Sequence, residues 1–176
     1  MNWFLSVDNN VTNSQKTTEG TFVKNEMRPI IEPLDSLPYP DFDIYGDLLF
    51  YRPYHGRLVR CLDYELSRGC IYNCTFCLSP FQREEYGTER GQPGHPSQFR
   101  REKSVDYIIK EIIYLKEKHN LDIIRYQDET FLTMRPKKLR ELAKEYSKHV
   151  HLPFIIEATI NTITNINING SDIFGW

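Results

Sequence analysis

Segments typical of β-strands alternate with segments typical of amphipathic helices from residue 58 to residue 160. Strands are predicted at residues 58–66, 121–126 and 153–160, where branched and aromatic residues concentrate. Helices are predicted between them, at residues 104–119 and 136–148. Single helices that join successive strands imply right-handed crossovers. The alternation therefore predicts an α/β fold with parallel strands.

Both predicted helices have an apolar face and recognisable ends. The face of the first is formed by Val105, Ile108, Ile109, Ile112 and Leu115. Ser104 is a suitable N-cap for this helix, and Asn120 suits its end. Pro136 suits the first turn of the second helix. The apolar face of that second helix is formed by Leu139, Leu142, Ala143 and Tyr146.

The first 33 residues show neither the alternating pattern of a β-strand nor the spacing of an amphipathic helix. Residues 1–33 are rich in Asn, Thr, Ser and Lys, and we interpret them as a flexible arm or linker. Residues 34–56 are predicted to form an extended, Pro-rich connector with buried rings, because Pro38 and Pro40 exclude a helix. Residues 57–176 form the predicted core. It ends in the low-complexity stretch NTITNINING without a third helix and looks truncated.

Charge and apolar content exclude several classes of protein. The 22 basic and 24 acidic residues give a net charge of -2, and no basic block favours nucleic acid or a membrane surface. No apolar run approaches the roughly 18 residues that a membrane span needs. The N-terminus lacks the basic region and long apolar stretch of a secretory signal. These observations predict a cytoplasmic protein.

Four cysteines fall at positions 61, 70, 74 and 77. Disulfides between them would close only small loops, so metal binding or redox chemistry is the better interpretation. Cys70, Cys74 and Cys77 have the spacing Cys-x3-Cys-x2-Cys, and Gly69 allows a tight turn before the first of them. A cube of four irons held by three thiolates leaves one iron open to a substrate or cofactor.

Residues 70–77, CIYNCTFC, resemble the signature of the radical S-adenosylmethionine (SAM) enzymes. The resemblance implies a partial (βα) radical SAM barrel in which the three thiolates hold a 4Fe-4S cluster. It implies that the amino and carboxylate groups of SAM bind the fourth iron. One electron then breaks the sulfonium bond, and a 5'-deoxyadenosyl radical abstracts hydrogen. Phe76 is expected to lie against the adenine.

Two later positions carry further candidates. Residues 127–131, QDETF, follow the second predicted strand and are similar to a phrase of the cobalamin-associated branch of these enzymes. The similarity implies that Asp128 and Glu129 contact SAM, whereas the alternative reading is a capped turn into the next helix. Glu157, in the third predicted strand, is a candidate for contact with the ribose, and it equally suits a position facing solvent.

Residues 31–45 and 99–115 resemble the connector and the start of the first barrel helix in the same branch. That branch uses cobalamin in its full-length proteins, but no Asp-x-His-x-x-Gly phrase marks a cobalamin ligand here. The core holds fewer βα units than a family barrel, so we expect a fragment. The resemblance further implies a small-molecule substrate and a one-electron donor such as flavodoxin or ferredoxin. It does not choose between methyl transfer and cyclisation.

Three other functions fit parts of the pattern. A zinc-stabilised binding module would use Cys61 as a fourth ligand beside Cys70, Cys74 and Cys77. An iron-sulfur electron carrier would need the same fourth thiolate. Cys61, however, lies in the first predicted strand, where a cysteine is most often a small buried apolar residue. A methylthiotransferase is rejected because residues 1–60 contain no cysteine.

Overall fold

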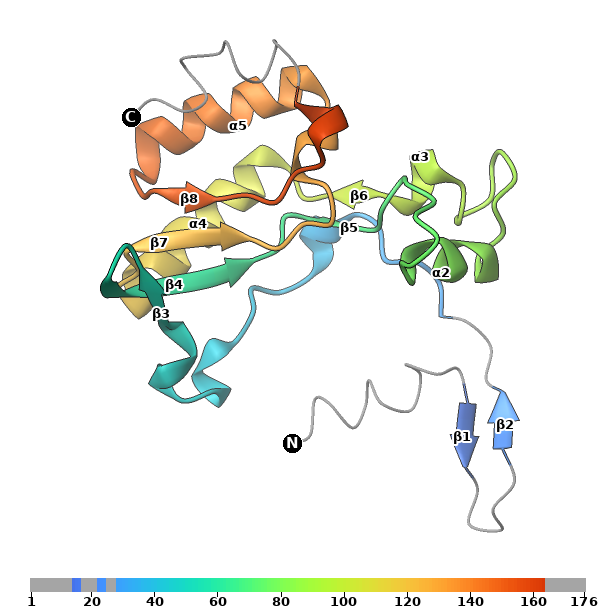
Figure 1. The fold of residues 1–176 in the computed structure, drawn as a ribbon, viewed down its shortest axis with the longest axis horizontal. Helices are drawn as coiled ribbons and strands as arrows, with labels where there is room; N and C mark the ends of the chain where they lie inside the picture. The colour runs from blue at the N-terminus through green and yellow to red at the C-terminus, as the bar shows by residue number, and fades with distance from the viewer. Residues whose placement is uncertain (1–13, 17–21, 25–27, 164–176) are drawn as a thin grey trace. The chain divides into compact units, whose positions relative to one another are not determined.

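The computed structural model describes residues 14–16, 22–24 and 28–163 (Figure 1). The chain divides into two compact units, which we call the loop unit, residues 1–31 with 72–99, and the sheet unit, residues 32–71 with 100–176. In the described part of the chain, no helix has the length and apolar character needed to cross a membrane. Most of the predicted arm and the end of NTITNINING lie outside the described residues.

The sheet unit is built on a four-stranded sheet with the order β3-β4-β7-β8. β4 (Arg57–Tyr64) and β7 (Ile123–Tyr126) are parallel, with Tyr64 opposite Tyr126. β8 (Phe154–Ile155) is parallel to β7 on its other side. The α/β fold with parallel strands predicted from the alternation is therefore confirmed for these three strands, although a closed barrel is not seen in the described residues.

β3 (Tyr51–Tyr54) is an antiparallel strand that the sequence analysis placed inside the extended connector. It joins β4 through His55 and Gly56, which both have positive φ and make a tight hairpin turn. Pro53 is compatible with this strand because β3 lies at the edge of the sheet, where no neighbour needs its missing N–H. The sheet is therefore mostly parallel rather than wholly so.

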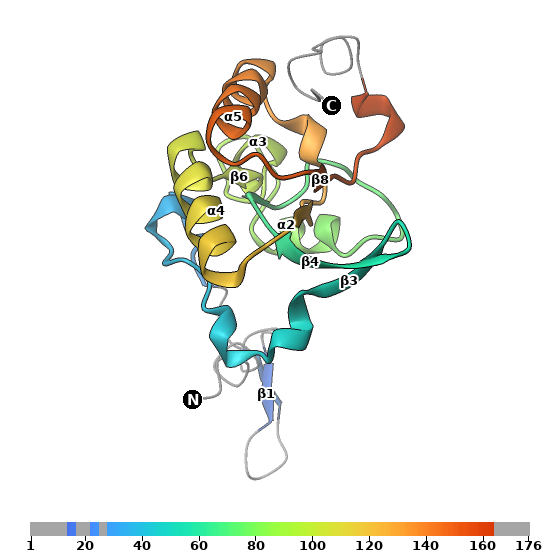
Figure 2. The same cartoon turned by 90° about the vertical axis from the view of Figure 1, so that its left-hand side faces the viewer.

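Helices α4 (Val105–His119) and α5 (Pro136–His149) lie on the same side of the sheet (Figure 2). Ser104 caps α4 by accepting a hydrogen bond from the Tyr107 amide, and Asn120 ends it with φ of 50°. Both predicted ends are thus confirmed. The layer between helices and sheet is apolar, and its fully buried members include Leu62, Leu66, Ile108, Ile112, Leu115, Ile124 and Tyr126.

The third predicted strand is much shorter than expected. Only Phe154 and Ile155 pair with β7, and a 3-10 turn follows at Ile160–Thr162. The prediction of a strand over residues 153–160 is therefore wrong for most of its length. Branched residues favour an extended chain, but a strand also needs a neighbour, and β7 itself is only four residues long.

The connector is irregular, with 3-10 turns at Leu34–Ser36, Phe42–Ile44 and Asp47–Phe50. Two hydrogen bonds attach it to the start of α4, because the Tyr107 hydroxyl donates to the Leu37 carbonyl and Asp35 accepts from the Ser104 amide. Its rings are unevenly buried: Phe50 lies in the core, while Tyr45 is exposed.

The loop unit contains a short antiparallel pair, β1 (Ser14–Lys16) with β2 (Phe22–Lys24), and two short helices, α2 (Ser79–Glu85) and α3 (Pro96–Phe99). Between the two helices the chain turns back on α2. Gly94 makes this approach possible, because a Cβ there would lie 2.0 Å from the Arg83 carbonyl oxygen.

Candidate functional site

Polar residues follow both central strands where these end side by side. β4 ends at Tyr64 and β7 at Tyr126, which is its partner in the parallel ladder. The chain then continues as Glu65 to Ser67 on one side and as Gln127 to Thr130 on the other. Ligands of parallel α/β sheets gather at this carboxyl edge. The edge therefore defines the candidate site of the sheet unit.

Asp128 is buried at this edge, with 2% of its surface exposed. One carboxylate oxygen accepts hydrogen bonds from the Ser67 amide, at 2.6 Å, and from the Ser67 hydroxyl, at 2.5 Å. The other accepts from the Leu66 amide, at 3.4 Å. Burial raises the pKa of Asp128 to about 6, although these hydrogen bonds act to lower it.

Arg100 connects the two segments from a third position. Its guanidinium donates to the Ser67 hydroxyl at 3.4 Å and to the Thr130 carbonyl at 3.3 Å, and it also pairs with Glu102. Burial lowers the pKa of Arg100, whereas the charges of Asp128, Glu129 and Cys70 act in the opposite direction. Those three residues, all predicted as site residues, therefore lie within electrostatic range of one guanidinium.

Glu129 and Glu157 differ from Asp128 in their surroundings. Both are exposed, and Glu157 lies beyond β8, outside any strand. Glu157 contributes to the raised pKa of Arg125, for which the hydrogen bond to Asp63 is the largest cause. The structure thus brings Glu129 to the carboxyl edge and places Glu157 after the shortened third strand.

A charged group that the sequence analysis missed lies on the face of the sheet away from α4 and α5. Asp63 accepts hydrogen bonds from Arg125 at 2.7 Å, from Arg52 at 3.2 Å and from Gln127 at 3.3 Å. Cys61 lies two residues before Asp63 on β4 and is buried, as predicted. Burial raises the pKa of its thiol, and the Asp63 charge adds to this effect.

The cysteine segment leaves the sheet unit through β5 (Ser67–Arg68), which pairs with β6 (Arg101–Glu102). Gly69 follows with φ of 87°, so the predicted turn before the first cysteine is confirmed. Cys70 is buried, with 7% of its surface exposed. Among the three cysteines of the triplet, Cys70 is the one that belongs to the sheet unit.

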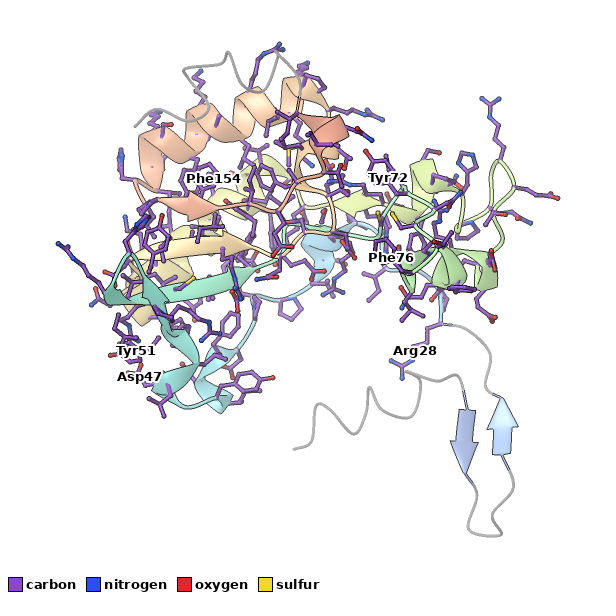
Figure 3. All side chains as sticks on the ribbon, in the orientation of Figure 1. Arg28, Asp47, Tyr51, Tyr72, Phe76 and Phe154 are labelled. Atoms are coloured by element: carbon purple, nitrogen blue, oxygen red, sulfur yellow. The ribbon has the colours of Figure 1, made fainter. Side chains whose placement is uncertain are left out.

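Cys74 and Cys77 belong to the loop unit. Cys74 is exposed, and its carbonyl accepts a hydrogen bond from the Cys77 amide at 3.1 Å. The Ser79 amide lies 3.5 Å from the Cys77 sulfur, and Asn73 accepts a hydrogen bond from the buried Arg83 of α2. Tyr72 and Phe76 are on the same segment (Figure 3), and the Phe76 ring is 92% exposed. The segment is thus tied to α2 through Asn73, while the Phe76 ring is left uncovered within the described residues.

The donor chemistry of the triplet fits an iron-sulfur cluster. Cysteine thiolates are the usual ligands of a 4Fe-4S cluster, and no disulfide consumes any of the four cysteines, all of which lie in the described residues. Among residues 14–16, 22–24 and 28–163, no group of three or more His, Cys, Asp or Glu side chains is arranged to hold a metal ion. The fit therefore rests on ligand type and sequence spacing.

Comparison with known proteins gave two similarities, and no family model matches the chain. An uncharacterized methyltransferase of Pyrococcus horikoshii is 31% identical over 122 residues, which cover 69% of this chain and 23% of the relative. A solved structure of the cobalamin-dependent S-adenosylmethionine radical enzyme OxsB, with aqua-cobalamin and S-adenosylmethionine bound, has a TM-score of 0.52 and 22% identity. It is matched over 80% of this chain and 18% of that chain. The chain thus spans less than a quarter of either protein, and the structural similarity shows a shared α/β fold.

Proposed function

We propose that this chain is part of a radical SAM enzyme and that Cys70, Cys74 and Cys77 hold a 4Fe-4S cluster. The observation that carries the proposal is the open Cys-x3-Cys-x2-Cys triplet, whose first member leaves the sheet beside the carboxyl edge of β4 and β7. The α/β fold shared with OxsB and the sequence similarity to a methyltransferase support it. When bound, the cluster supplies the electron that cleaves SAM for hydrogen abstraction.

The residues of the chain would bind and orient SAM. Glu129 is exposed at the carboxyl edge and carries the negative charge needed to accept hydrogen bonds from the SAM amino group. Phe76 presents an uncovered ring, which suits stacking on the adenine. Glu157 is exposed and suits hydrogen bonds to the ribose hydroxyls. Arg100 adds a buried positive charge that balances the acidic residues and the Cys70 thiolate.

The activity of the whole protein is a broader proposal, because the chain spans only part of each protein it matches. The name of the Pyrococcus horikoshii protein favours methyl transfer, and cyclisation remains the alternative reaction. Similarity to a cobalamin-dependent enzyme favours cobalamin as a further cofactor of a longer protein. We propose a small-molecule substrate, a flavodoxin or ferredoxin as the electron donor, and a cytoplasmic location.

Anaerobic reconstitution of the 176-residue chain tests the proposal. We expect about four irons and four sulfides per chain, and a paramagnetic spectrum of the reduced cluster that changes when SAM is added. Replacing Cys70, Cys74 or Cys77 by Ser should remove most of the iron. The matched control is Cys61→Ser, because Cys61 is buried inside β4 and should not be a ligand.

Three results would overturn the proposal. One tightly held zinc without labile sulfide would favour the zinc-stabilised module. Loss of the cluster in Cys61→Ser would instead identify a fourth protein ligand, as in an electron carrier. A cluster whose spectrum is indifferent to SAM would likewise remove the enzymatic claim.

A further inference from the structure

Asp128 uses its carboxylate within the protein rather than presenting it to a ligand. Only 2% of the residue is exposed, and both oxygens accept hydrogen bonds. The donors are the amides of Leu66 and Ser67 and the Ser67 hydroxyl, all from the segment that follows β4. Glu129, the next residue, is exposed. The two acidic residues of QDETF therefore have different surroundings and suit different roles.

The segment that Asp128 binds leads directly to the first cysteine. Ser67 lies three residues before Cys70 and belongs to β5. The same segment is held from the other side, because the Lys103 amide donates to the Leu66 carbonyl at 2.9 Å and Arg100 donates to the Ser67 hydroxyl. The backbone before Gly69 is thus fixed by a buried set of hydrogen bonds, and the positive φ of Gly69 sets the direction of the chain that follows.

We infer that Asp128 is a positioning residue, which fixes the backbone at Ser67 and thereby holds Cys70 in place, and that Glu129 alone of the pair faces the ligand. The inference rests on the proposed function, since it gives Cys70 its purpose as an iron ligand. It assigns to Asp128 a role other than the SAM contact that the motif suggests. A buried carboxylate with three protein donors has little capacity left for a ligand amino group.

Alkylation of the cluster-free chain measures this role without any cofactor. Iodoacetamide is added to the full chain, and the modification of each cysteine is followed by peptide mass spectrometry. Cys70 should react slowly in the wild type because it is buried, and Cys74 should react fast because it is exposed. Cys61, buried in β4, reports whether the sheet unit stays folded. Three cysteines thus serve as probe, reagent control and folding control.

In Asp128→Ala we expect Cys70 to be alkylated at least ~10-fold faster, since hydrogen bonds to a charged acceptor that hold its segment are lost. The rates of Cys61 and Cys74 should not change. Asp128→Asn keeps one oxygen acceptor for Ser67 and should give an intermediate rate. The matched control is Asp122→Asn, which removes a carboxylate that accepts a hydrogen bond from the Arg60 amide before β7 begins. This control should leave Cys70 protected.

The outcomes separate this inference from the proposed function. Faster reaction of Cys70 alone, with reduced iron after reconstitution of Asp128→Ala, supports both. Faster reaction of Cys70 alone in a chain whose wild type takes up no iron would sustain the positioning of Cys70 and remove the cluster. An unchanged Cys70 rate, or a parallel rise at Cys61 in both Asp128 variants, would overturn the inference even if the wild type holds its cluster.

Discussion

Replacing Lys103 by Met should destabilise the sheet unit strongly, because it leaves a buried carboxylate without its positive partner. Glu111 is fully buried on the sheet side of α4, and its Oε2 accepts a hydrogen bond from the Lys103 ammonium at 2.7 Å and another from the Tyr64 hydroxyl. The ammonium also lies 4.6 Å from the centre of the Tyr64 ring. Removing one partner of a buried ion pair typically costs about 3–5 kcal/mol.

Urea denaturation followed by far-UV circular dichroism measures this effect, since α4 and α5 are the longest helices in the described residues. The matched control is Lys110→Met, which removes the partner of Asp106 in an exposed pair on the same helix and should leave the midpoint unchanged within error. The double variant Lys103→Met with Glu111→Leu should regain most of the loss. If Lys103→Met cost less than about 1 kcal/mol, the value typical of exposed pairs, the reasoning about burial would be refuted.

Two further predictions concern the ends of α4 and β7. Ser104→Ala removes the acceptor for the Tyr107 amide and should lower the free energy of unfolding by about 1 kcal/mol. Ser104→Thr keeps a hydroxyl acceptor and should not lower it. Equal urea midpoints for the wild type and both variants would contradict the cap. Asp128 has a pKa of about 6 in the folded chain against 3.8 in the reference state, so its contribution to stability is present below the lower value and lost as pH rises through the higher one. The difference in unfolding free energy between wild type and Asp128→Asn should change by about 2 kcal/mol between pH 4 and pH 7, and a constant difference would contradict the shift.

The sequence predicts α4 and α5 well because their signals are local, whereas the short helices α2 and α3 are not predicted. Ser104 and Asn120 mark the ends of α4 by the side chain and backbone conformation that each favours, and Pro136 marks the start of α5. The strands depend on partners instead. β3 lies in the predicted connector because its pairing with β4 has no local signal, and the prediction for β8 is too long because propensity does not show where pairing stops.

The candidate site likewise combines features that are visible in the local sequence with features that depend on distant partners. The cysteine spacing and the turn at Gly69 are visible in the sequence, and the turn is confirmed. The partner of Asp128 is not visible, since Ser67 is 61 positions away and no local pattern in the sequence connects the two residues. Arg100 lies within residues 99–115, which resemble the start of the first barrel helix, but its contacts with Ser67 and Thr130 depend on how β4 and β7 meet.

The register between β4 and β7 also determines where Cys70 is held. Side chains alternate between the two faces of a strand, so sliding β4 by a single residue would exchange all of its side chains between the layers. Asp63 would then enter the apolar core between the sheet and the helices, and its hydrogen bond with Arg125 would be lost. Ser67 would move away from Asp128 by about 3.3 Å, the rise of one strand residue. Asp63 and Arg125, on the face of the sheet away from α4 and α5, therefore disfavour the wrong register. The register that keeps them paired is also the one in which Asp128 holds the segment before Cys70.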